Sequence, residues 1–179
     1  MDLGAQLTPE QMDAVVLDAQ NRVRESFDGM PVFGVSGWSG PLMIGEWSWR
    51  DGSRGLAHGT PDGGSFVQVH THPDDARLAV HDLRMSAAGV LGTFTDFDSP
   101  PDRLAEIVVD ETPVLFEVWE DERNAWAGGN YLDHGIVVEA RRADLDDLRL
   151  RQVTDIEPYL EGQLELIRRA RREAGGHEI

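Results

Sequence analysis

The stretch VLFEVW, residues 114–119, alternates between two kinds of position. Val114, Phe116 and Val118 would lie on one side of a strand and the intervening residues on the other, because successive side chains of a strand point to opposite faces. The first side is wholly apolar, whereas the second includes the carboxylate of Glu117. This pattern is typical of an antiparallel sheet with one buried face and one partly solvated face.

Other segments in the middle of the chain share this texture. They are short, rich in β-branched or aromatic residues, and bounded by Gly, Pro, Asp or Asn: residues 31–35, 42–49, 66–70, 136–140 and 148–153. Such segments predict strands, about six in all. They cluster without a helix between each pair, which favours a mainly antiparallel, twisted sheet over a doubly wound parallel fold.

Helix signals stand at both ends of this central region. Thr8 is a cap, Pro9 suits the first helical position and Gln11 follows three residues after the cap, which predicts a helix over residues 9–27. An apolar stripe that begins near Pro158 predicts a second helix, to about residue 173.

A third, shorter helix is expected over residues 98–110, with Leu104, Ile107 and Val108 facing inward. Together these elements predict one α+β domain, residues 1–179, with the N- and C-terminal helices packed on one face of the sheet.

Composition excludes several kinds of chemistry. The chain has no cysteine, and all its 16 basic residues are arginine. Thiolate nucleophiles, Fe–S clusters, Schiff-base lysines and the Walker lysine are therefore absent.

The charge indicates which partners the chain favours. A formal net charge of −17 opposes a nucleic-acid backbone and suits a basic protein partner. No apolar run approaches the roughly 20 residues that a membrane-spanning helix needs. The N-terminal residues also lack the basic start and apolar core of a secretory signal. We expect a cytoplasmic protein that does not enter the membrane.

Three of the five tryptophans fall in the glycine-rich stretch of residues 34–55. Trp38, Trp47 and Trp49 are candidates for a ligand or partner surface, because large amphipathic rings suit recognition. The alternative is that Trp47 and Trp49, which would share one face of a strand, close the core.

A cluster of histidines and aspartates occupies residues 65–82. If residues 66–72 are extended, His70 and His72 lie on the same face and could reach one metal ion. A catalytic zinc takes about three protein ligands and a water, so Asp74, Asp75, His81 or Asp82 would have to supply the third.

The sequence His70-Thr71-His72-Pro73, followed by Asp82, resembles the motif of JAMM/MPN metalloproteases. That resemblance implies zinc ligands at His70, His72 and Asp82, with Glu46 as the general base. The chain departs from the motif in two ways. Ala79 stands in place of the motif serine, and the spacing to Asp82 is one residue short.

Two other families match the same stretch in part. Residues 72–75, His-Pro-Asp-Asp, resemble the LmbE/PIG-L-type zinc deacetylases, but Ala76 replaces their glutamate. Residues 70–75 resemble the His-x-His-x-Asp-His motif of metallo-β-lactamase-like enzymes, but Asp75 replaces the last histidine.

A structural interpretation accounts for the same residues without a metal. Pro73 with two acidic residues behind it is a common helix start, in which the carboxylates complement the helix dipole. Ala76 and Val80 would then belong to the inner stripe of that helix. We therefore favour a non-enzymatic binding or accessory protein without a cofactor, such as an immunity-type or regulatory protein, that engages a basic protein. The alternative is a zinc-dependent hydrolase that uses His70, His72 and Asp82.

Overall fold

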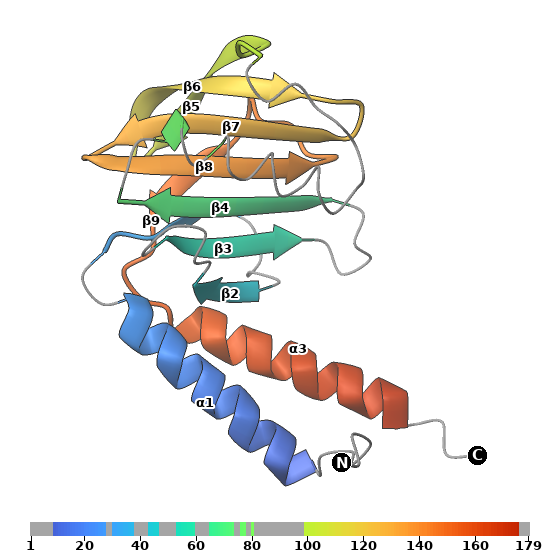
Figure 1. Ribbon diagram of the computed structural model, residues 1–179. Helices are drawn as coiled ribbons and strands as arrows, with labels where there is room; N and C mark the ends of the chain where they lie inside the picture. Colours follow the sequence, from blue (N-terminus) through green and yellow to red (C-terminus); the bar gives the residue numbers. More distant parts are fainter. Residues whose placement is uncertain are drawn as a thin grey trace.

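A computed structural model describes residues 9–27, 30–37, 43–46, 53–59, 65–73, 76–77, 80 and 99–175 of the chain (Figure 1). The N-terminal part contains α1 (Pro9–Phe27), β1 (Phe33–Val35), β2 (Met43–Glu46), β3 (Arg54–Gly59) and β4 (Phe66–His72). The C-terminal part contains β5 (Arg103–Val109), β6 (Thr112–Glu120), β7 (Asn124–Tyr131), β8 (His134–Arg141), β9 (Arg149–Gln152) and α3 (Glu157–Gly175).

The strands form one sheet in the order β1-β9-β5-β6-β7-β8-β4-β3-β2, which curls into a nearly closed barrel. Every neighbouring pair is antiparallel except β5 and β9, which run parallel. Two hairpins have two-residue turns, Asp110-Glu111 between β5 and β6 and Leu132-Asp133 between β7 and β8. All four turn residues have positive φ, the conformation of a type I′ turn, whose twist matches that of the flanking strands.

Side chains rather than a backbone ladder join β1 to the opposite side of the barrel. The Phe33 backbone N–H donates to Thr71 Oγ1 at 3.3 Å, and the Val35 N–H donates to His58 Nε2 at 3.3 Å. Gly34 lies between these donors, where an added Cβ would be 2.8 Å from Leu56 Cδ1. These contacts give the edge donors of β1 acceptors inside the protein, which an exposed edge strand would lack.

The core of the barrel consists of the inward-facing side chains of its own strands. Phe116 and Val118 belong to this core, whereas Leu115 on the same strand is exposed, as the alternation in residues 114–119 predicted. Among the core residues are Phe33, Val67, Ile107, Ile136, Val138 and Leu150. Among the residues that the structure describes, this core cluster contains no side chain of either helix.

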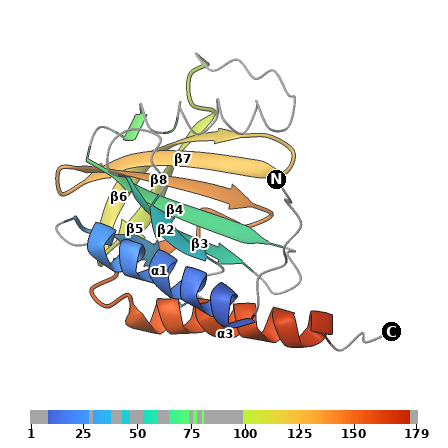
Figure 2. The ribbon, with the colours of Figure 1, turned by 60° about the horizontal axis from the view of Figure 1, so that its bottom comes forward.

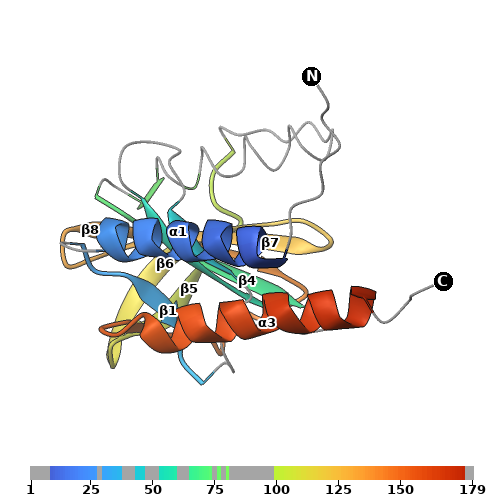
Figure 3. The ribbon, with the colours of Figure 1, turned by 90° about the horizontal axis from the view of Figure 1, so that it is seen from below.

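The helices lie at the β2 side of the barrel, antiparallel and side by side (Figures 2 and 3). Leu160 of α3 packs with Val32 and Leu56 in a separate small cluster, against which Val23 of α1 is partly buried. Among the described residues, no helix is both long enough and apolar enough to cross a membrane.

The predicted fold class was therefore wrong, although both terminal helices were predicted correctly. The protein is not an α+β fold with a six-stranded sheet and helices on one face; it is mainly β. The prediction missed β3 and β7 and assigned a helix to residues that form β5. With these three strands the sheet is long enough to curl on itself and cover its own apolar face, so the helices pack at the rim.

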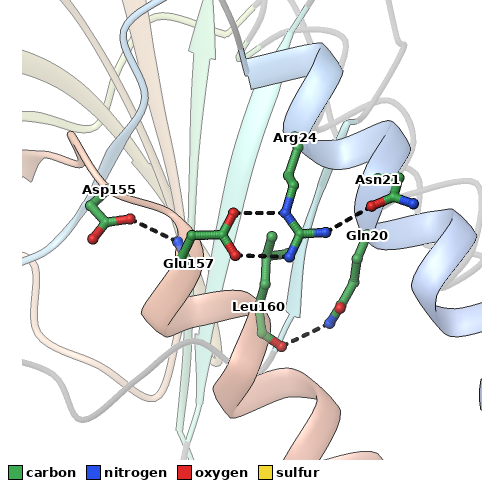
Figure 4. A network of polar contacts seen from close by, with 6 residues as sticks. All are labelled: Gln20, Asn21, Arg24, Asp155, Glu157 and Leu160. Atoms are coloured by element: carbon green, nitrogen blue, oxygen red, sulfur yellow. Dashed lines mark hydrogen bonds and ion pairs between the residues drawn. The ribbon is translucent and has the colours of Figure 1, made fainter.

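A buried polar contact links the helices. Gln20 is 4% exposed, and its Nε2 donates to the Leu160 carbonyl oxygen at 2.7 Å (Figure 4). One turn away, Arg24 forms a bidentate ion pair with Glu157 at 2.7 and 2.8 Å, but these side chains are partly exposed.

We expect Gln20→Leu to lower the free energy of unfolding by about 1 kcal/mol, because a buried hydrogen bond is lost while the volume is kept. Urea denaturation measures this change. Arg24→Gln is the matched control and should have the smaller effect, because solvent screens the exposed pair. Equal or reversed effects of the two substitutions would show that the buried contact does not hold the helices together.

Candidate functional site

His70 and His72 lie on the outer face of β4, as the alternation predicted. Val67 and Val69, which occupy the alternate positions of the strand, point into the core. Both imidazoles are nevertheless buried, at 0% and 6% exposure. Their ring centroids are 6.2 Å apart with an interplanar angle of 40°. The fold therefore brings the two histidines together.

Burial decides the protonation of His70. Burial, and to a lesser extent the nearby charge of His72, lowers the pKa of His70 to about 3. The ring of His70 is consequently neutral near pH 7, which is the form that a metal ion binds. Val137 lies opposite His70 on β8 and Gly55 opposite it on β3, whereas the carboxylate on the same face of β8, that of Glu139, lies opposite Gln68.

A metal centre requires a third ligand. Among the residues that the structure describes, no group of three or more His, Asp or Glu side chains could hold an ion. Glu46 ends β2 opposite Arg54, which is itself opposite Thr71 in β4, so two strand spacings separate the backbone of Glu46 from that of β4. Asp82 falls outside the described residues, and the zinc-dependent hydrolase stays a prediction.

The outer surface beside the histidines is covered by the chain that follows β4. Ala76 and Val80 are helical and pack with Trp119, Trp126 and Val137. The Ala76 N–H donates to Asn130 Oδ1 at 2.9 Å. The structural interpretation, in which Ala76 and Val80 face inward, is confirmed for these two residues. Val137, which lies opposite His70 on β8, belongs to this packed cluster, so the covered surface begins directly beside the histidines.

A different part of the outer surface lacks such a cover. On β5 and β6, Leu104 lies opposite Glu117, and Glu106 lies opposite Leu115. We call these four residues the leucine–glutamate face. Leu104 is 57% exposed and Leu115 63% exposed. Exposed apolar side chains bordered by polar groups make this face a candidate interaction surface.

The sequence contained a signal for this face that the predicted helix concealed. In residues 103–109, Ala105, Ile107 and Val109 alternate with Leu104 and Glu106, which is a strand pattern. The assignment of Leu104 to an inward helical position hid its exposure. The candidate recognition residues Trp38, Trp47 and Trp49 lie outside the described residues, so their role stays a prediction.

Comparison of the chain with models of known protein families, and with curated proteins, finds no match. The function therefore has to be inferred from the side chains and their positions.

Proposed function

We propose that this chain is a non-enzymatic binding or accessory protein, and that the leucine–glutamate face engages a basic protein. The observation that carries the proposal is the exposure of Leu104 and Leu115 on a strand pair whose opposite side forms a well-packed core. The core accounts for the fold, whereas these two leucines contribute little to it. Their burial against a partner would remove apolar surface from water.

The chemistry of the face favours arginine or lysine side chains on the partner. Glu106 and Glu117 lie diagonally across the two strands, each directly opposite a leucine. A long basic side chain can lay its apolar stem on a leucine and reach a carboxylate with its charged end. Glu117 also forms an ion pair with Arg77 at 3.3 Å, but Arg77 is 68% exposed, so solvent weakens this pair and a partner's cation can compete for the carboxylate. The net charge of −17 would speed the approach of a basic protein.

The proposal predicts a salt-sensitive complex that depends on Leu115. The immobilised chain is used to capture proteins from native lysate, and each captured protein is identified, purified and titrated by calorimetry. We expect a partner with a pI above about 9 whose affinity falls at least roughly tenfold from about 50 to about 300 mM salt. Leu115→Arg should weaken binding by at least about tenfold, because it removes apolar contact and adds a like charge to the interface.

Leu132→Arg is the matched control, since Leu132 is also 63% exposed but lies in the β7–β8 turn. It introduces the same charge elsewhere and should leave the affinity close to that of the wild type. Equal losses in the two variants, or an affinity independent of salt, would contradict the proposed face.

A further inference from the structure

A pocket of about 240 Å³ adjoins the core, between the β6–β7 turn and the segment after β8. Ala125, Ala140 and Leu145 line its apolar part, and Ala140 and Leu145 are also core residues. Its remaining lining is mostly charged. An apolar part can hold the hydrocarbon portion of a small ligand, and a few charged groups can fix its orientation.

Several of the lining charges already serve the fold. Arg103 contacts Glu120 Oε1 at 2.7 Å and Asp146 Oδ1 at 2.7 Å. The Asp121 carboxylate accepts the backbone N–H groups of Arg123 and Asn124 at 2.7 and 2.8 Å, which closes the β6–β7 turn. These groups are committed to internal contacts.

Arg142 differs from them in both backbone and side chain. Its φ is 52°, in the left-handed region that glycine and asparagine favour, so its conformation is strained for an arginine. Its N–H donates to the Arg123 carbonyl oxygen at 3.2 Å, which places the two arginines beside each other at the pocket. Within the described part of the chain, the Arg142 guanidinium forms no ion pair or hydrogen bond that would account for an arginine at this position. Strain of this kind is often kept where a side chain has a function.

We propose that this pocket binds a small organic monocarboxylate. Arg142 and Arg123 supply guanidinium N–H donors for the two carboxylate oxygens, and a short apolar chain packs against Ala125, Ala140 and Leu145. The carboxylate of Asp144, which also lines the pocket, repels every anion, and it repels a dianion about twice as strongly as a monocarboxylate. This site is separate from the leucine–glutamate face and does not depend on the proposed function.

Titration of the ¹⁵N-labelled full chain with butyrate, followed by NMR, tests the site. We expect saturable shifts confined to the amides of residues 121–125 and 140–145 and to the Arg142 Nε–H. Butylammonium, which has the opposite charge, and inorganic phosphate should produce none. Saturation by phosphate, shifts spread over the surface, or no saturable shift would overturn the proposal.

Arg142→Gly provides the decisive variant, because glycine adopts the observed φ without strain. It should keep the thermal midpoint at or above that of the wild type and weaken butyrate binding at least about tenfold. Arg142→Asn, which also tolerates positive φ, gives a second variant with the same expected loss. Arg141→Gln, at the end of β8, should leave binding unchanged. Undiminished binding by both Arg142 variants would rule out the assigned role.

Discussion

Phe116→Ala should lower the free energy of unfolding by about 3 to 5 kcal/mol, the largest change that we expect from one substitution. Phe116 is fully buried and belongs to the core cluster, to which β1, β4 and β5–β9 all contribute side chains. Removing its ring leaves a cavity that the surrounding strands cannot close, because the hydrogen-bonded ladder fixes their spacing. Since domains of this size are stable by only about 5 to 15 kcal/mol, the variant should unfold at much lower urea concentration.

The position of the ring can be tested through Gly129. A Cβ at Gly129 would lie 2.8 Å from Phe116 Cδ2 and 2.9 Å from its Cε2, closer than carbon atoms pack. Gly129→Ala should therefore destabilise the protein by about 1 to 3 kcal/mol. In a Phe116→Leu background this cost should be smaller, because the shorter side chain leaves room for the new methyl group.

Gly162→Ala is the matched control for this pair. Gly162 lies in α3, and nothing lies within 4 Å of the position that an added methyl group would take, so alanine should stabilise the helix by about 0.5 to 1 kcal/mol. Urea denaturation of Gly129→Ala, Phe116→Leu, Gly162→Ala and the Gly129→Ala/Phe116→Leu double variant measures each change in the free energy of unfolding. If Gly129→Ala cost as much in the Phe116→Leu background as in the wild type, the ring would not be the obstacle.

Acidification from pH 6.5 to pH 4 should remove stability through His58, the residue that joins β3 to β1. Burial lowers the pKa of His58 to about 4, from 6.5 in the unfolded chain. In the folded protein, Nε2 accepts the Val35 N–H, so the proton of the neutral ring belongs on Nδ1. Protonation of Nε2 would place two donors against each other at the junction of the barrel.

The sign of the effect follows from the direction of this shift. Well above pH 6.5, His58 is neutral in both the folded and the unfolded protein, so its full contribution to the free energy of unfolding is present. As the pH falls below 6.5, His58 of the unfolded chain binds a proton before His58 of the folded protein does. The free energy of unfolding therefore falls by up to about 3 kcal/mol by pH 4. The lowered pKa of His70 acts in the same direction. Below the folded pKa values, the histidine contribution to the pH dependence should level off.

Urea denaturation of the wild type and His58→Gln across this pH range measures the His58 contribution. Glutamine can accept the Val35 N–H without titrating, so the stability of this variant should fall less steeply between pH 6.5 and 4. Long-range ¹H–¹⁵N NMR spectra should also show the Nδ1–H tautomer of His58 near pH 7. The same slope in both proteins, or an Nε2–H tautomer, would contradict the assigned contact.

Local signals predicted the terminal helices and the strands that alternate clearly. The cap at Thr8, with Pro9 behind it, predicted the start of α1, and Val114, Phe116 and Val118 predicted the buried side of β6. The alternation of residues 66–72 likewise predicted that His70 and His72 share a face. These features depend only on neighbours in the sequence, so the local pattern is enough to predict them.

Turn chemistry concealed other strands. The β5–β6 and β7–β8 turns use Asp110-Glu111 and Leu132-Asp133 with positive φ, where Asn-Gly or Asp-Gly is the usual signal. Without that signal, β5 resembled a helix. The strand β7 was not predicted, and it contains glycine, which is uncommon inside strands, at Gly129, the residue that makes room for Phe116.

The sequence by itself determined the terminal helices, the alternation of the clearest strands and the acidic charge. Only the tertiary structure decided that the sheet closes on itself, which side chains join β1 to β3 and β4, and that Leu104, Leu115 and Arg142 remain exposed. The reason is that closure depends on contacts between distant residues, such as Phe33 with Thr71, 38 positions apart. A local pattern specifies which face of a strand is apolar, but the partner strands and the curvature of the sheet decide what covers that face.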